Sequence, residues 1–275
     1  MRKLRVIRIV AAAFFLLAVT VCFLDFTGTT SRWLGWTVKL QLMPAALALG
    51  VTAAVILAVT FVFGRVYCSV VCPLGILQDV AIFCRRAFRL KFTPVAQQGR
   101  VAVCRKIVRG AIAVIFFAGG FLGVHFLWLE PYAIYGRMAT SLAAPLFRLG
   151  NNQLAHWAER HGSYAFHSVE VVAPPTCMVV LSAALLVLIL VLAFWKGRFW
   201  CNTVCPIGTV LGSMAWFSLF KPKIDKDKCV KCRLCEGVCK ARCIDIAHGT
   251  IDRAACVACF DCGAVCGRGA LTWSK

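Results

Sequence analysis

The chain has 275 residues, of which 61% are hydrophobic, and it carries a formal net charge of +20. This hydrophobic fraction exceeds that of soluble globular domains, so we expect a membrane protein in contact with lipid. Nucleic acid is not an expected partner, because the basic residues gather in particular loops, as they do beside the spans of multi-pass membrane proteins.

Four apolar segments predict transmembrane helices, the form that satisfies its own backbone hydrogen bonds in lipid. The first, residues 9–24, follows a basic start and resembles a signal peptide. No small-residue cleavage site follows it, so we expect a helix that is retained. The other three predicted spans are residues 44–63, 110–129 and 176–195.

Lys and Arg are divided unequally between the two sides of these spans. Nineteen lie in the N-terminal segment and in residues 64–109 and 196–228, whereas five lie in residues 25–43 and 130–175. The positive-inside rule therefore predicts that both termini are cytoplasmic.

A sixteen-residue motif follows the second and the fourth span. Residues 64–79 read GRVYCSVVCPLGILQD and residues 197–212 read GRFWCNTVCPIGTVLG, with seven of sixteen positions identical at an offset of 133 residues. We therefore expect residues 1–220 to form a membrane domain of two duplicated two-helix units, related by an axis along the membrane normal.

Each copy of the motif contains a C-x3-C-P sequence, with Cys68 and Cys72 in the first and Cys201 and Cys205 in the second. Four residues apart on a helical turn is one face, so the two pairs can meet as four thiols. Such thiols could ligate a further iron–sulfur cluster or a thiophilic metal such as Cu(I), or form a redox dithiol. Buried structural cysteines are the alternative, which the duplication of both cysteines and both prolines disfavours.

Glu130 and Arg137 lie at the predicted outer interface, in the stretch LEPYAIYGR of residues 129–137. A carboxylate there could accept a proton from a quinol, or it could only pair with the arginine.

The C-terminal residues 221–275 contain two C-x2-C-x2-C-x3-C runs, 27 residues apart. This is the bacterial two-cluster ferredoxin pattern, in which the fourth cysteine of each run binds the other cluster. It predicts an α+β domain with two [4Fe–4S] clusters. Zinc sites favour paired C-x2-C units separated by a longer gap, which disfavours zinc. The ligands would be Cys229, Cys232, Cys235 and Cys266 for the first cluster, and Cys239, Cys256, Cys259 and Cys262 for the second.

Two residues beside these runs are unusual. Lys240 follows the last cysteine of the first run, and its charge is expected to raise the potential of a nearby cluster. Cys243 is an extra cysteine close to Cys239 that could be a spare thiol or a replacement ligand.

The first C-x3-C-P motif, the LEPYAIYGR stretch, the second C-x3-C-P motif and the ferredoxin runs, in this order, resemble the NapH/MauN type of membrane ferredoxin. The C-x3-C-P and ferredoxin parts also resemble the C-terminal part of NosR and the core of CcoG-type proteins. In that family the ferredoxin runs usually end in Cys-Pro, whereas Lys240 and Gly267 stand in the proline positions here.

The resemblance implies a multi-pass iron–sulfur protein of the bacterial inner membrane. It would pass electrons between the quinone/quinol pool and a redox partner of a reductase or maturation system. The likeness to CcoG leaves a copper reductase or assembly factor acting through the C-x3-C-P thiols as an alternative, and a structural anchor as a third. Fingerprints for NAD, flavin or ATP are missing from the sequence, so we expect an electron-transfer component rather than a stand-alone enzyme.

Overall fold

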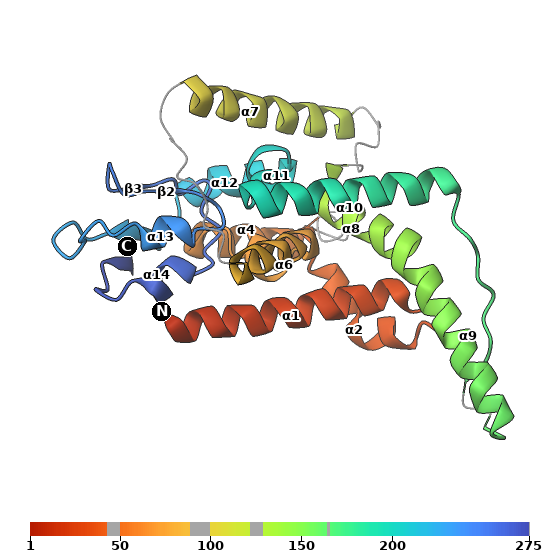
Figure 1. Ribbon diagram of the computed structural model, residues 1–275. Coiled ribbons are helices and arrows are strands. Elements are labelled where there is room, and N and C mark those ends of the chain that lie inside the picture. Colours follow the sequence, from red (N-terminus) through yellow and green to blue (C-terminus); the bar gives the residue numbers. More distant parts are fainter. Residues whose placement is uncertain (43–49, 89–99, 122–128, 164–165, 275) are drawn as a thin grey trace.

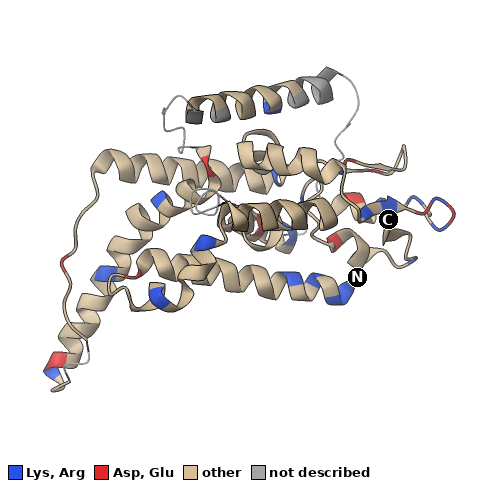
Figure 2. Ribbon diagram, turned by 180° about the vertical axis from the view of Figure 1, so that it is seen from behind, with Lys and Arg blue, Asp and Glu red and all other residues tan. Residues whose placement is uncertain are grey.

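The computed structural model describes residues 1–42, 50–88, 100–121, 129–163 and 166–274. Long helices run side by side, and the ferredoxin part covers one end of them (Figure 1). Both termini lie at that end. Lys and Arg colour the first turns of α1 and the ferredoxin loops there (Figure 2).

Among the described residues that precede β1, all regular elements are helices. Its elements are α1 (Arg2–Leu24), α2 (Thr29–Lys39), α4 (Val51–Phe63), α5 (Tyr67–Val70), α6 (Pro73–Ala87), α7 (Arg100–Phe121), α8 (Pro131–Met138), a π-helical segment η2 (Ala139–Ala143), α9 (Ala144–Arg160), α10 (Thr176–Lys196), α11 (Phe199–Thr203) and α12 (Pro206–Trp216).

Within the described ranges, α1 and α10 are long and apolar enough to cross a bilayer, with mean hydropathies of 2.6 and 3.1. Protein covers little of either, since 22% and 17% of their apolar windows are buried. The other two predicted spans fall partly on residues 44–49 and 122–128, outside the described residues, so a four-span membrane domain stays a prediction.

The two halves of the helical part repeat one order of elements. A long helix, α4 or α10, ends at a glycine and is followed by a short helix, α5 or α11, and then by a helix that begins with proline, α6 or α12. The two glycines, Gly64 and Gly197, have φ of 79° and 67° with ψ of −162° and −143°. Essentially only glycine adopts this conformation, which gives a physical reason for glycine at the start of both motif copies.

The ferredoxin part consists of β1 (Lys221–Ile224), α13 (Leu234–Gly237), β2 (Ile244–Asp245), β3 (Thr250–Ile251), α14 (Asp261–Val265) and β4 (Leu271–Ser274). Strand β1 pairs antiparallel with β4, from Lys221 opposite Ser274 to Ile224 opposite Leu271, and β2 pairs with β3. The β1–β4 pair joins the first and last segments of this part, so both cysteine runs are enclosed between them.

Candidate iron–sulfur sites

The four C-x3-C-P cysteines come together where the two motif copies meet. Cys68 and Cys201 lie on the short helices, and Cys72 and Cys205 precede the prolines as the N-caps of α6 and α12. Each is 4% exposed. Burial and then the neighbouring thiols Cys201, Cys68 and Cys205 raise the pKa of Cys72, which places all four within electrostatic reach of one another. We call these four residues the C-x3-C-P centre.

The N-termini of α6 and α12 point their backbone N–H groups at this centre. The N–H of Gly208 donates to Cys205 Sγ at 3.2 Å, and the N–H of Gly75 donates to Cys72 in the other copy. Helix N-termini carry partial positive charge and stabilise thiolates. These N–H groups therefore favour ionised sulfur, the metal-binding form, and oppose the burial that raises the pKa of Cys72.

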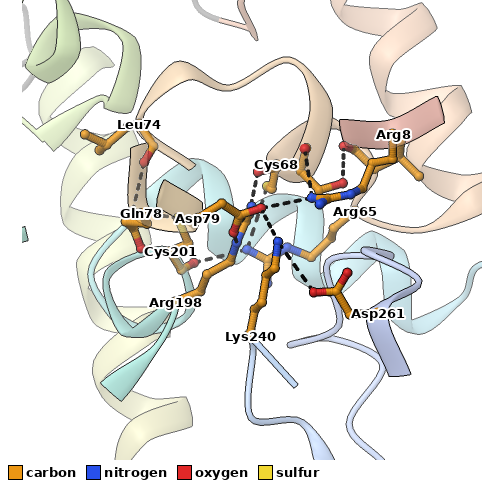
Figure 3. Close-up of polar contacts among 12 residues, drawn as sticks. Arg8, Arg65, Cys68, Leu74, Gln78, Asp79, Arg198, Cys201, Lys240 and Asp261 are labelled. Carbon is orange, nitrogen blue, oxygen red and sulfur yellow. Dashed lines mark hydrogen bonds and ion pairs between the residues drawn. The ribbon is translucent and has the colours of Figure 1, made fainter. Parts of the chain in front are cut away.

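The arginines of the two motif copies cross to the opposite copy. Arg65 donates to the carbonyl oxygen of Cys201 at 3.1 Å, and Arg198 donates to the carbonyl oxygen of Cys68 (Figure 3). The exchange is reciprocal, as expected for two copies related by a pseudo-twofold axis. It ties the two halves of the C-x3-C-P centre to each other.

Arg65 is fully buried, and no carboxylate is among its partners in the described part of the chain. Its guanidinium contacts Asn202 Oδ1 at 2.7 Å, the Ala254 carbonyl at 2.9 Å and Cys68 Sγ at 3.8 Å. A buried cation is costly unless an anion compensates it. The thiols of the C-x3-C-P centre are the groups at hand that can supply that negative charge.

A buried ion-pair network lies beside the centre. Asp79 accepts from Arg8 at 2.9 Å, from Arg198 at 2.8 Å and from Lys240 at 2.8 Å. Burial alone would raise the pKa of Asp79, but Arg198 and Lys240 hold it well below its ordinary value. Lys240 also lies 3.6 Å from Asp261 (Figure 3). Asp261 pairs with Arg5 and Arg86 as well. The network joins α1, α6, the start of α11 and the ferredoxin part.

The eight cysteines of the ferredoxin runs line two separate cavities. The first cavity is lined by Cys229, Cys232, Cys235 and Cys266. The second is lined by Cys239, Cys256, Cys259 and Cys262.

Both ferredoxin runs share a strained backbone. Lys231 and Arg233 in the first run, and Ala258 and Phe260 at the matching positions of the second, have positive φ between 48° and 59°. Left-handed residues in such loops turn successive N–H groups toward one concavity that binds anions. The residues present fit [4Fe–4S] clusters, whose thiolate ligands make them anionic.

The second cavity lies against the C-x3-C-P centre. Val257 and Cys259 belong to the same buried apolar cluster as Cys68, Cys72 and Cys205. Hydrogen bonds also hold the ferredoxin backbone to the second motif copy. The Arg198 N–H donates to the Lys240 carbonyl at 2.9 Å, and Asn202 donates to the Ala241 carbonyl at 3.3 Å. The first cavity, by contrast, has an exposed predicted ligand, Cys232.

Cys243 lines the second cavity together with its four predicted ligands. Its Sγ lies 3.5 Å from Cys239 Sγ, and it also hydrogen-bonds Cys256. The sequence allows Cys243 to be a spare thiol or a replacement ligand, and the structure places it beside two predicted ligands. Within the described ranges, no three His, Cys, Asp or Glu side chains are placed to hold a single metal ion.

Glu130 is 1% exposed and caps α8, where its carboxylate accepts from the N–H of Ala133. Its other oxygen, Oε1, is buried without a hydrogen-bond partner in the described part of the chain. Burial raises the pKa of Glu130 to about 7, although Arg137 and the N–H groups act to lower it. Burial, then Cys72, and then Glu130 raise the pKa of Tyr67, so Glu130 acts on the residue that precedes Cys68.

Sequence reasoning missed the arginines and Asp79. Arg65 and Arg198 had a signal, because both stand at the second position of the duplicated motif. The sequence signal for Asp79 was weaker, because it is only an isolated acidic residue in an apolar helix. Its partners Arg8 and Lys240 are 71 and 161 residues away in the chain, and no local pattern links them.

Comparison with known proteins gives one family match, found twice. The family described as a 4Fe-4S binding domain matches residues 45–91 and 178–226, and each match contains one C-x3-C-P motif. The two matches start 133 residues apart, the offset of the duplicated motif. No solved structure matches the chain.

Three relatives are similar over most of the chain. An uncharacterized protein of Methanocaldococcus jannaschii is 28% identical over the full chain and 89% of its own length. The ferredoxin-type protein NapH of Haemophilus influenzae is 27% identical over 72% of this chain and 55% of its own length. The methylamine utilization ferredoxin-type protein MauN of Paracoccus denitrificans is 27% identical over 76% of this chain and 58% of its own length. The match thus spans little more than half of NapH and of MauN.

Proposed function

We propose that this chain, an iron–sulfur electron-transfer protein of the NapH/MauN ferredoxin type, relays electrons between the quinol pool of a bacterial inner membrane and a redox partner in the cytoplasm. The observation that carries the proposal is the contact between the C-x3-C-P centre and the second ferredoxin cavity. Thiol-lined sites thus follow one another from the helical part of the chain to its ferredoxin end.

We further propose that Cys68, Cys72, Cys201 and Cys205 hold a third [4Fe–4S] cluster. The family match over both C-x3-C-P motifs supports this, and so does the buried charge of Arg65. Bound clusters supply one-electron carriers at these sites. The chain's own part is to place the sites close together, to exclude water from them and to surround them with positive charge.

The quinol end of the path is proposed to lie near Glu130. Oxidation of one quinol releases two electrons and two protons. Glu130 is a buried carboxylate whose Oε1 has no hydrogen-bond partner among the described residues, and it lies within electrostatic reach of Tyr67 beside the C-x3-C-P centre. A carboxyl group with a pKa near the working pH is suited to accept a proton in the transition state. Glu130 is therefore the proposed acceptor of one quinol proton.

The proposed topology places both termini in the cytoplasm. The excess of Lys and Arg in the predicted inner loops supports it. The arrangement of the helices agrees, because the N-terminus and the ferredoxin part lie at the same end (Figure 1). Clusters on that side would lie in the reducing compartment, where thiolates persist.

The test is anaerobic reduction of the purified protein by decylubiquinol, followed by EPR. We expect the ferredoxin signals to appear in the wild type and to be lost in Cys68→Ser, which keeps all eight ferredoxin cysteines. Dithionite, which needs no quinol site, is the control and should reduce the ferredoxin clusters of both proteins. If quinol reduces neither protein but the wild type reduces and retains copper in a Cys68-dependent way, a copper reductase replaces the relay.

A further inference from the structure

The two ferredoxin runs have opposite exposure at matching positions, 27 residues apart. Val230 is 62% exposed, whereas the equivalent Val257 is 1% exposed. Leu234 is 53% exposed, whereas the equivalent Asp261 is 2% exposed. The second run packs against the helices, whereas in the described structure the first run faces outward. Two large apolar side chains therefore lie in the open beside the first cavity.

The charge around the two runs differs in the same way. The first run carries Lys228, Lys231 and Arg233, all exposed, and Arg268 adds a fourth exposed cation beside Cys266. At the positions that match the first three, the second run has Ala255, Ala258 and Phe260. A run can therefore form the ferredoxin loop conformation without these cations. The loop conformation thus does not explain why the first run carries them.

We call the basic face the exposed surface around the first cavity, with an apolar centre and a cationic rim. Five of its members line the cavity together with the four cysteines, namely Lys228, Val230, Arg233, Leu234 and Arg268. One cation, Lys228, is partly offset by Asp225 at 3.1 Å, and Asp227 is the only other acid in this loop. The basic face comprises Lys228, Val230, Lys231, Arg233, Leu234 and Arg268.

We propose that the basic face is the docking site of an acidic electron-transfer protein. An apolar centre with a charged rim is the usual anatomy of a specific protein contact. Complementary charge steers and orients such encounters. The exposed Cys232 places a predicted cluster ligand at this surface. In each encounter one electron leaves the donor and one is gained by the acceptor, and no bond is made or broken.

The position of the basic face favours a protein over lipid headgroups. The segment between β1 and α13 extends beyond the N-terminal end of α1 in both views (Figures 1 and 2). It lies farther along the helix direction than the helix end that would meet a membrane surface. The inference rests on the proposed electron relay, because it names the partner at the ferredoxin end of that path.

The experiment uses the full-length protein in lipid nanodiscs, loaded with clusters, and an acidic flavodoxin as the probe. Binding is measured at low and at moderate salt. We expect the double variant Lys231→Glu, Arg233→Glu to weaken binding by about tenfold or more at low salt and to flatten the salt dependence. The control Lys39→Glu, Arg160→Glu makes the same charge change on α2 and α9, and it should bind as the wild type does.

Two outcomes would overturn the proposal. One is wild-type binding that is absent, or that the reversal at residues 231 and 233 leaves unchanged. The other is an effect of the reversal that appears only in nanodiscs with anionic lipid and vanishes with phosphatidylcholine, which would assign the basic face to headgroups. Reduction by decylubiquinol is measured on the same samples. Flavodoxin binding that persists without it would count against the relay and not against the docking site.

Discussion

In the first C-x3-C-P copy, Arg65, Cys68, Cys72 and Gly75 occupy the places that Arg198, Cys201, Cys205 and Gly208 hold in the second. Two kinds of contact at these places are the same in both copies. Each arginine reaches the other copy's first cysteine, and each second cysteine caps a helix that begins with proline.

Nine of the sixteen motif positions differ, and at three of them the first copy has a side chain whose polar contacts the second copy lacks. Tyr67 donates to Gln41 at 3.1 Å, whereas its counterpart is Trp200. Gln78 donates to Cys201 Sγ at 3.2 Å, whereas its counterpart is Leu211. The third pair is Asp79 and Gly212.

The shared positions make the C-x3-C-P centre symmetric, and the differing positions make its two sides unequal. Asp79 connects the centre to α1 and to the ferredoxin part through Arg8, Arg198 and Lys240. Gly212 instead leaves room for the chain, because an added Cβ would lie 2.8 Å from the Ala254 carbonyl oxygen. The two copies of the motif therefore share one frame and differ in their polar contacts.

The largest expected effect comes from Asp79→Asn, which removes the charge that distinguishes the first copy. Arg8, Arg198 and Lys240 would lose their shared carboxylate in a buried site. Breaking such a network costs about 3–5 kcal/mol. Chemical unfolding in detergent, followed by the visible absorbance of the clusters, should show this loss. Asp225→Asn makes the same change in an exposed pair with Lys228 and should leave the unfolding midpoint where it is.

Glu130→Gln comes next, and it tests whether the quinol side belongs to the first copy, next to Tyr67. Proton transfer by a placed side chain contributes roughly 100-fold or more to a rate. Because burial raises the pKa of Glu130 to about 7, the carboxylate form is scarce below that pH and dominant above it. The wild-type rate of reduction by decylubiquinol should therefore rise with pH through about 7. In Glu130→Gln the rate should be low and flat, while reduction by dithionite is unchanged. A variant that keeps the wild-type pH profile would remove Glu130 from the proposed path.

Gly75→Ala and Gly208→Ala probe the shared frame. The added Cβ would lie 2.4 Å from the carbonyl oxygen of Cys68 in one and 2.1 Å from that of Cys201 in the other. Each should destabilise the protein by about 1–3 kcal/mol through overpacking. Gly110→Ala on α7 meets nothing within 4 Å and is the matched control. Large loss in one copy with none in the other would mean that the two halves are not equivalent at this position.

The smallest effect is expected from Gln78→Leu, which gives the first copy the residue of the second. One N–H to sulfur hydrogen bond is lost, worth about 1 kcal/mol. Such bonds stabilise the more negative, reduced form, so the potential of the C-x3-C-P centre should fall by roughly 40 mV for a one-electron couple. A redox titration followed by EPR measures this shift, and the titration of the ferredoxin clusters serves as the internal reference.

Much of the site could be predicted because its cysteines lie in motifs that occur twice in the sequence. The 133-residue offset of Cys68 and Cys201 indicated a meeting of two cysteine pairs, and the 27-residue offset of the ferredoxin runs indicated two groups of four. Identity and spacing carry such information locally. The structure places each group together, and the family comparison supports the NapH/MauN type.

The ion-pair network could not be predicted in the same way. Lys240 pairs with Asp79 across 161 positions of the chain, and only tertiary packing brings them together. The sequence predicted that Lys240 would raise the potential of a nearby cluster, which stays a prediction. Its pairing with Asp79 and Asp261 offsets part of that charge. The difference in exposure between Val230 and Val257 could not be predicted from the sequence either. The two runs have similar sequences, and only the packing of one run on the helices makes them differ.

The C-x3-C-P centre is tested most directly by counting iron and acid-labile sulfide in the anaerobically purified protein. Three [4Fe–4S] clusters predict about twelve irons per chain, and Cys68→Ser with Cys201→Ser should lower the count to about eight. About eight irons in the wild type, unchanged in that variant, would mean that the C-x3-C-P thiols hold no cluster, and would contradict the account.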